Sequence, residues 1–171
     1  MTKFSSLLSL AALSAALLVA GCTTPKQAAT TTPPATGYST PPATSTIVPG
    51  SAEDLRVNVG DTVHFAYNEY NIEDNDKATL QRQAAWLAKY PSIKVTVEGD
   101  CDERGTREYN LALGARRANA VKEYLVSLGV SGARVETISY GKEHPVCSES
   151  TEDCWAQNRR GVTSISGGPS S

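Results

Sequence analysis

The chain has 171 residues, with 16 Lys and Arg against 18 Asp and Glu, which gives a formal net charge of −2. This balance gives no electrostatic reason to expect a nucleic-acid partner. The two His residues, His64 and His144, lie 80 positions apart, so a zinc cluster with the usual local spacing is not expected. We predict no metal site and no cofactor, and the length suits one domain with flanking segments.

The N-terminal segment has the layout of a secretory signal peptide. Lys3 precedes an apolar run from Leu7 to Ala20, which is shorter than the ~20 residues that a membrane-spanning helix needs. The tetrapeptide Val19–Cys22 resembles the bacterial lipobox, in which the Cys is acylated and the peptide is cut before it. We therefore expect a lipoprotein signal peptide over residues 1–21, and the alternative is an ordinary signal peptide with an incidental Cys.

Residues 22–54 are predicted to be a lipidated N-terminus followed by a flexible linker. Six of the nine prolines lie here, and the sequence of residues 33–36 recurs at residues 41–44. Such a segment has too little apolar surface to offset the entropy of ordering it. This segment could be a tether that lets the domain reach away from the membrane, or a linker whose length does not matter. In lipoproteins of this kind, an Asp after the lipidated Cys retains the protein in the inner membrane, so Thr23 points to the outer membrane.

Residues 55–166 carry the patterns of a single domain, and residues 167–171 are expected to be a flexible tail. Apolar residues alternate with polar ones over Leu55–Val59 and again over Val63–Tyr67. Because Gly60 lies between these two runs, the pattern predicts a β-hairpin.

Helices and strands are predicted to alternate after the hairpin. Asp74 or Asn75 is expected to cap a first helix, and a second runs from about Thr106 to Leu128 with Gly129 as its C-terminal cap. The first helix carries apolar residues at spacings of four and three: Leu80, Ala84 and Leu87. Strands are expected at residues 93–97, 135–140 and 161–165, with a short helix at 151–158. This order favours an α+β sandwich with a mixed sheet and helices on one face.

The loop from Glu98 to Thr106 is rich in charged side chains. Arg117, 15 residues after Asp102, falls on the apolar stripe of the second helix, where an unpaired guanidinium group is costly. A carboxylate, a guanidinium group and the free N–H groups of a helix start together suit a zwitterionic ligand. The alternative is a salt bridge between Asp102 and Arg117 that only fixes the fold.

Several segments together resemble the peptidoglycan-associated lipoproteins, a group with an OmpA-like domain. These are Glu98–Thr106, Glu108–Gly114, Arg116–Val121, Ser139–Glu143 and Asn158–Arg160. The resemblance covers about residues 55–165 and also the lipobox. It implies an OmpA-like two-layer sandwich that binds, without covalent chemistry, the diaminopimelate of the peptidoglycan stem peptide.

The resemblance also implies which residues form the binding site. Asp102 and Arg117 match the ligand-binding Asp and Arg of the family, and the remaining expected site residues are Phe65, Tyr67, Asn68, Leu113 and Thr106. The chain departs from the family at Ala66 and Asn68, where Asp is common, and at Asp100, where His is common. The carboxylate of Asp100 could weaken the binding of an anionic peptide or strengthen the hold on an ammonium group. Arg159 and Arg160 match a motif that buttresses the site or pairs with acids.

Three cysteines remain once Cys22 is assigned to the lipid. An odd number in an oxidising compartment means one free thiol or an intermolecular bridge. Cys147 and Cys154 flank six residues and are the pair that the spacing favours, which leaves Cys101 free, although pairing of Cys101 with either stays open. Since this bridge lies far in sequence from the charged loop, we expect its reduction to leave ligand binding in place.

Three functional classes compete. A binder would hold peptidoglycan while its lipid holds the outer membrane. An enzyme would use Asp102 and Glu103 as acid and base, but adjacent loop carboxylates without a hydrophobic pocket are a weak case. An interaction module would dock envelope proteins. The resemblance implies that TolB and other Tol proteins are partners, with a role in envelope integrity and cell division. The sequence thus favours a non-enzymatic, periplasm-facing outer-membrane lipoprotein.

Overall fold

The computed structural model describes residues 47–168. The predicted signal peptide, Cys22 and most of the predicted linker lie outside these residues, so the predicted domain boundaries stay predictions. The elements follow in the order α1 (Ala52–Asp54), η1 (Leu55–Val59), β1 (Thr62–His64), α2 (Asp74–Lys89), β2 (Lys94–Asp100), α3 (Arg107–Ser127), η2 (Gly132–Arg134), β3 (Val135–Gly141), α4 (Glu152–Asn158) and β4 (Arg160–Gly167).

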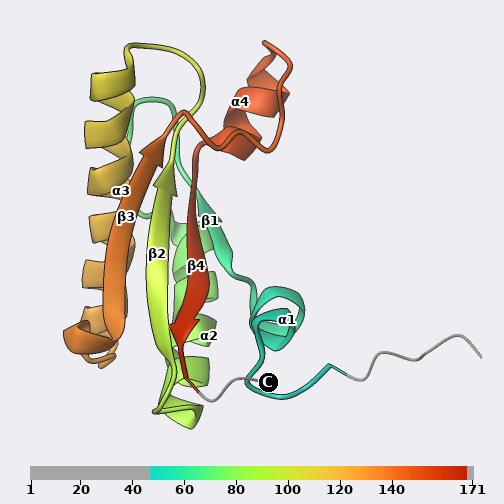
Figure 1. Cartoon of the computed structure of the whole chain (residues 1–171), viewed down its shortest axis with the longest axis vertical. Helices are drawn as coiled ribbons and strands as arrows, with labels where there is room; N and C mark the ends of the chain where they lie inside the picture. Colours follow the sequence, from blue (N-terminus) through green and yellow to red (C-terminus); the bar gives the residue numbers. More distant parts are fainter. Residues whose placement is uncertain (1–46, 169–171) are drawn as a thin grey trace, which may run out of the picture. The chain divides into compact units, whose positions relative to one another are not determined.

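The four strands form one mixed sheet in the order β1-β4-β2-β3 (Figure 1). Strand β2 is parallel to β3 and antiparallel to β4, and β4 is also antiparallel to β1. Helix α3 packs on β2 and β3, and α2 packs beside α3 and against β1. The expected α+β sandwich with a mixed sheet and helices on one face is confirmed.

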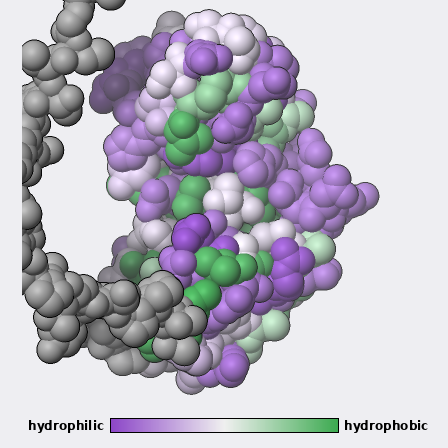
Figure 2. Space-filling model, turned by 90° about the vertical axis from the view of Figure 1, so that its right-hand side faces the viewer, coloured by the Kyte–Doolittle hydropathy of each residue, from purple (hydrophilic) through white to green (hydrophobic). Residues whose placement is uncertain are grey.

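The core lies between the sheet and the two long helices. Its residues come from the positions at which the apolar patterns predicted a buried face, and they are fully buried: Leu80 and Leu87 of α2, Val95 and Val97 of β2, and Val121 and Leu125 of α3. Burial of such side chains contributes about 1.5–3 kcal/mol each. On the face shown in Figure 2, apolar side chains lie in small groups among hydrophilic ones.

The predicted strand over Leu55–Val59 is wrong, because this segment is helical. Residues 55–59 form a single π-helical turn that continues α1 and ends at Gly60, whose φ is +90°. Leu55 and Val59 are buried whereas Val57 is 50% exposed. Spacings of two and of four both fit these three residues, and the two buried ones share one side of a helical turn.

The predicted strand Val63–Tyr67 ends earlier than expected. Strand β1 stops at His64, and the chain then turns through Asn68, which has a left-handed φ of 59°. The backbone of Phe65 still pairs with Arg159, whose carbonyl oxygen accepts from the Phe65 N–H at 2.9 Å. Phe65, Tyr67 and Asn68 thus lie in a loop that follows the edge strand.

The predicted helix termini are close to the observed ones. Helix α2 is capped by Glu73 rather than by Asp74 or Asn75, and the Glu73 side chain makes no capping hydrogen bond. Helix α3 begins after Thr106, whose Oγ1 accepts from the backbone N–H of Tyr109. Gly129 adopts a left-handed φ of +95°, as expected for a residue that follows a helix end.

Helix α3 comes unusually close to β2 at a pair of glycines. A Cβ atom on Gly99 would overlap the carbonyl oxygen of Gly114, and one on Gly114 would overlap Gly99 and Ser139. The Ser139 hydroxyl donates to the carbonyl oxygen of Leu111 on the same helix at 2.7 Å. This close approach fixes the first half of α3 against the end of β2, where the charged loop begins.

Over residues 47–168, no helix is long and apolar enough to cross a membrane.

Candidate ligand-binding site

The loop between β2 and α3 is held by hydrogen bonds to its backbone. The Asn110 side chain donates to the carbonyl oxygens of Arg104 at 2.8 Å and Thr106 at 3.2 Å. Lys142 donates to the carbonyl oxygens of Glu103 at 3.0 Å and Gly105 at 2.7 Å. These two side chains come from α3 and from the turn after β3, so the loop conformation depends on tertiary contacts.

Arg117 forms the deepest part of the site. Its side chain is fully buried, and its guanidinium group donates to three backbone carbonyl oxygens: Glu69 at 2.8 Å, Asp100 at 2.8 Å and Ala66 at 3.1 Å. The guanidinium carbon also lies 5.1 Å from the centre of the Phe65 ring. Burial lowers the pKa of Arg117, but a guanidinium group stays charged at any physiological pH. The group is thus desolvated and forms no ion pair with an acid in the part of the chain that the structure describes, which leaves its charge available to an anion.

Asp102 is almost as deeply placed and has cationic partners. Arg104 donates to it from Nε at 3.1 Å and from Nη2 at 2.7 Å, and its backbone N–H adds a third hydrogen bond at 3.1 Å. Arg159 approaches the same carboxylate at 3.4 Å. Burial alone would raise the pKa of Asp102, but the hydrogen bonds from Arg104 outweigh it and bring the pKa below its usual value. Asp102 is therefore ionised at neutral pH.

The alternative of a fold-fixing salt bridge between Asp102 and Arg117 is wrong. Within residues 47–168, Asp102 pairs with Arg104 and Arg159, and no ion pair joins Asp102 to Arg117. The two residues instead face a common pocket of about 140 Å³. The structure brings five of the expected site residues together on its wall: Tyr67, Asn68, Asp102, Leu113 and Arg117.

Two expected site residues do not line this pocket. Phe65 is 3% exposed and supports the guanidinium group of Arg117 from below. Thr106 caps α3. The pocket wall also contains Arg104, Tyr109 and Asn110, which the sequence reasoning did not select. A signal for Asn110 was present, since it precedes Leu113 and Arg117 by three and seven residues on one helix face.

The outer edge of the pocket is aromatic. Tyr67 is 60% exposed, and the Tyr109 hydroxyl donates to the side-chain oxygen of Asn68. The guanidinium carbon of Arg104 lies 4.1 Å from the ring centre of Tyr67 and 4.1 Å from that of Trp155. Arg104 is thus held between two rings while it contacts Asp102.

The carboxylate of Asp100 is directed away from the pocket. It is 1% exposed and pairs with Arg160 at 3.1 Å, while its backbone carbonyl accepts from Arg117. Burial raises the pKa of Asp100 to about 6, and Arg160 offsets only part of this effect. The expected direct influence of this carboxylate on an ammonium group therefore has no geometric support. Arg159 and Arg160 both pair with acids: Arg159 with Asp102 of the pocket wall and with Glu152, and Arg160 with Asp100.

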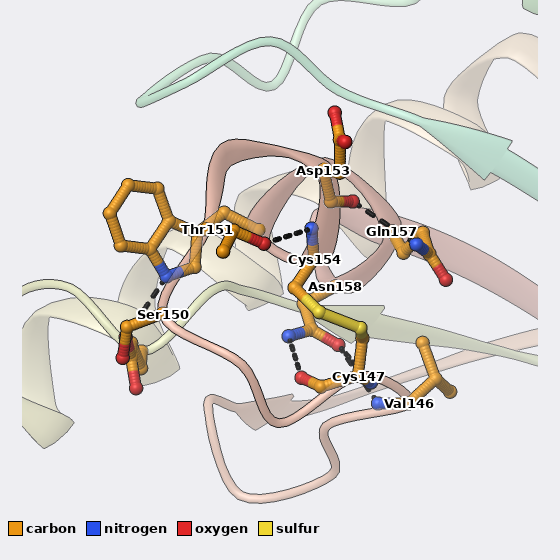
Figure 3. Close-up of a disulfide and its surroundings, with 10 residues drawn as sticks. Val146, Cys147, Ser150, Thr151, Asp153, Cys154, Gln157 and Asn158 are labelled. Carbon is orange, nitrogen blue, oxygen red and sulfur yellow. Dashed lines mark hydrogen bonds between the residues drawn. A yellow bond between two sulfur atoms is a disulfide. The ribbon is translucent and has the colours of Figure 1, made fainter. Parts of the chain in front are cut away.

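The disulfide links Cys147 to Cys154, the pair that the spacing favoured, and Cys101 is free and buried (Figure 3). Asn158 reinforces this bridge, because its side-chain oxygen accepts from the backbone N–H of Val146 at 2.8 Å and its amide donates to the carbonyl of Cys147 at 2.6 Å. The bridge thus fastens α4 to the loop that precedes it.

Helix α4 reaches the site despite its distance in sequence. Glu152 accepts from Arg159 at 2.8 Å, and Trp155 donates from Nε1 to Glu103 at 3.0 Å. The bridge is therefore close to the site in space although it lies far from the charged loop in sequence, and the expected survival of ligand binding on reduction stays a prediction. Among residues 47–168, no three His, Cys, Asp or Glu side chains gather where they could hold a metal ion.

Known proteins resemble this chain in sequence and fold. The OmpA family matches residues 64–159. A peptidoglycan-associated lipoprotein of Rhizobium meliloti is 59% identical over 119 residues, which cover 70% of this chain and 68% of that protein. One from Agrobacterium fabrum is 47% identical over 156 residues, covering 91% and 86%.

Solved structures agree with the sequence comparison. The peptidoglycan-associated lipoprotein from Burkholderia pseudomallei has a TM-score of 0.60 and 44% identity, covering 61% of this chain and 89% of that one. The C-terminal domain of Helicobacter pylori MotB, at 24% identity and a TM-score of 0.58, shares the fold. The chain therefore belongs to the OmpA family and, within it, to the peptidoglycan-associated lipoproteins.

Proposed function

We propose that this chain is an outer-membrane lipoprotein whose domain binds the diaminopimelate of the peptidoglycan stem peptide and so ties the outer membrane to the cell wall. The observation that carries the proposal is the pocket that Asp102 and Arg117 share. The relatives are named for an association with peptidoglycan. The free end of diaminopimelate presents one ammonium and one carboxylate group, which complement one acidic and one basic side chain.

The charges of the pocket favour such a zwitterion. Arg117 is desolvated and lacks an acidic partner within residues 47–168, so a ligand carboxylate would gain a charge-assisted contact there. Asp102 supplies the negative charge for an ammonium group. The pocket volume of about 140 Å³ suits the end of a side chain rather than a whole peptide.

The contacts of the two loop carboxylates argue against an enzyme. A general acid at neutral pH needs a raised pKa. The pKa of Asp102 is lowered, with hydrogen bonds from Arg104 outweighing burial. Hydrogen bonds from Ser150 and Trp155 lower the pKa of Glu103. Both carboxylates are thus set up as stable anions, which suits binding.

The binding proposal is tested by sedimentation with purified sacculi. Asp102→Leu should lose binding at least tenfold while it stays folded, since a charge-assisted hydrogen bond contributes roughly 1.5–3 kcal/mol. Asp153→Leu, which removes an exposed acid on α4, is the matched control and should bind normally. Amidation of the free diaminopimelate carboxylate should weaken binding to the unaltered protein, because it removes the anion that Arg117 would contact. A folded Asp102→Leu protein with unchanged affinity would contradict the proposal.

The lipid anchor is tested separately, at Cys22. We expect Cys22→Ala to leave an unacylated precursor that no longer fractionates with the outer membrane. Metabolic labelling with palmitate followed by membrane fractionation measures this. Label that persists in the Cys22→Ala protein would mean that the acylated residue lies elsewhere.

We further propose that the domain is recognised by TolB and takes part, with the other Tol proteins, in envelope integrity and cell division. The exposed aromatic edge of the pocket, with Tyr67 and Tyr109, supports a protein contact that overlaps the peptidoglycan site. If so, TolB and soluble stem peptide should compete for the domain in a titration. Simultaneous binding of both would contradict an overlapping surface.

A further inference from the structure

The carboxylate of Asp102 has little free capacity for a ligand. An ionised carboxylate offers about four lone-pair sites. Three of them accept hydrogen bonds from Arg104, and Arg159 approaches the same carboxylate at 3.4 Å. An incoming ammonium group can contact Asp102 closely only if a guanidinium group gives up part of its contact.

Glu152 is placed where it can receive those guanidinium groups. Its Oε2 lies 3.6 Å from Arg104 Nη1, and its Oε1 lies 2.8 Å from Arg159 Nη2. Its own side chain is 62% exposed, against 5% for Asp102. Both guanidinium groups that contact Asp102 therefore have the same second acid within reach.

The aromatic contacts of Arg104 permit such an exchange. Its guanidinium group lies between the rings of Tyr67 and Trp155, each at 4.1 Å. Stacking of this kind restricts movement out of the plane of the guanidinium group more than movement within it. Arg104 can therefore turn from Asp102 toward Glu152 and keep both ring contacts.

The position of Glu152 is itself fixed. It is the first residue of α4, whose N-terminus is capped by Thr151 and whose Cys154 is bridged to Cys147 (Figure 3). One turn later, Trp155 donates to Glu103 on the site loop. The helix cannot move away from the loop without breaking these contacts.

We propose that Glu152 is a positioning residue of the binding site: it keeps Arg159, with which it already pairs, and accepts Arg104 when the ammonium group of the ligand takes their place on Asp102. This inference rests on the proposed function, because it assigns an event to the same pocket. It predicts that Glu152 affects recognition of the ammonium group and not of the carboxylate group.

The test uses two soluble stem peptides and two protein variants. One peptide carries diaminopimelate, and the other has the distal ammonium group replaced by hydrogen. Dissociation constants come from NMR titration, which reaches millimolar values. We expect Glu152→Gln to weaken binding of the first peptide about three- to tenfold and to leave the second unchanged. Glu149→Gln removes an exposed acid three residues away and should change neither.

A second readout follows Arg104 directly. In the wild-type protein, the Nε–H resonance of Arg104 should shift when the first peptide binds, because its contact with Asp102 weakens. This shift should be smaller with the peptide that lacks the ammonium group. Thermal melts of both variants establish that they are folded.

The outcomes separate the two proposals. If the wild-type protein fails to bind the diaminopimelate peptide, the proposed function fails and this inference fails with it. If the wild-type protein binds normally but Glu152→Gln weakens both peptides equally, or neither, only the inference is overturned. An Arg104 resonance that is unmoved by the first peptide would also overturn it.

Discussion

The floor and the rim of the pocket are built in different ways. The floor is Arg117, which lines the pocket, together with the backbone that supports it: the Asp100 carbonyl, which accepts from Arg117, and the close contact of Gly99 with Gly114. The rim is Arg104, which lines the pocket, together with helix α4 that supports it, and it is held by side-chain ion pairs, ring stacking and one disulfide. Backbone contacts between packed elements have one arrangement, whereas side-chain pairs have alternatives within reach. We therefore expect changes to the floor to cost folding stability and changes to the rim to alter ligand selection.

This difference also explains why the basic residue of the site lies in the floor. Arg117 donates to three backbone carbonyl oxygens, so its position is fixed before a ligand arrives. A fixed cation binds an anion without an entropic cost of its own ordering. The rim, by contrast, has to admit the ligand.

The largest effect is expected from Arg117→Leu. This change removes the charged donor from the carbonyl oxygens of Ala66, Glu69 and Asp100, although that of Ala66 keeps a hydrogen bond from the Glu69 N–H at 3.2 Å. We expect a loss of about 3–5 kcal/mol in the free energy of unfolding, because each of these hydrogen bonds involves a charged donor. Urea denaturation measures it. A loss below about 1 kcal/mol would mean that water replaces the guanidinium group and that the floor is less dependent on Arg117 than its contacts indicate.

The next largest effect is expected from Gly114→Ala. Alanine gains about 1 kcal/mol of helix propensity over glycine, but the new methyl group would overlap Ser139 and the backbone of Gly99. The backbone of Gly99 cannot rotate out of the way as a side chain can. We therefore expect a net loss of about 3 kcal/mol in the free energy of unfolding. Gly132→Ala is a suitable control, because a Cβ there has only one ordinary contact, with Val126 at 3.6 Å. Equal melting temperatures for the two variants would contradict a tight helix–sheet contact.

Asp100 makes the floor sensitive to pH. Its pKa is raised by burial to about 6 in the folded protein, against 3.8 for an exposed Asp. The folded state thus binds more protons than the unfolded state between these values, so stability falls as pH rises from about 4 to 6. A shift of this size corresponds to roughly 2–3 kcal/mol.

Asp100→Asn should remove this pH dependence, as measured by urea denaturation from pH 4 to 7. Asp102 has a lowered pKa, so its contribution has the opposite sign and is lost only below about pH 4. The two effects therefore occupy different pH ranges. A wild-type protein whose stability is flat between pH 4 and 6 would mean that Asp100 is ionised at less cost than its burial implies.

The sequence predicted the two charged residues of the pocket and little of what supports them. Arg117 was recognisable because a charged residue interrupts an apolar helix stripe, and Asp102 because it lies in a charged loop before a capped helix. Two of the three partners of Arg117, however, are carbonyl oxygens of a segment about 50 residues earlier, and backbone atoms leave no trace in the residue pattern. Arg104 stacks on one ring from residue 67 and another from residue 155, which only the tertiary structure brings together.

The strand predicted over Leu55–Val59 was wrong for a similar reason. Its alternating apolar residues fit a strand and a helical turn equally, and the contacts of Leu55 and Val59 with the core decide in favour of the turn. Short patterns of this kind are decided by packing rather than by local preference.

The smallest effect is expected from reduction of the Cys147–Cys154 bridge, and it falls on the rim. Closing a loop of about eight residues contributes at most about 2.5 kcal/mol in the chain-entropy model. Asn158 and the Thr151 cap hold the same segment without the bridge, so α4 should loosen rather than unfold. Because α4 carries Glu152 and Trp155, we expect the affinity for the diaminopimelate peptide to fall two- to fivefold on reduction. The Cys147→Ser/Cys154→Ser variant should reproduce this loss and should be insensitive to reductant, which excludes an effect through Cys101. If reduction lowers the melting temperature but leaves the affinity unchanged, then α4 holds its position without the bridge. The adjustable part of the pocket would in that case be Arg104 alone.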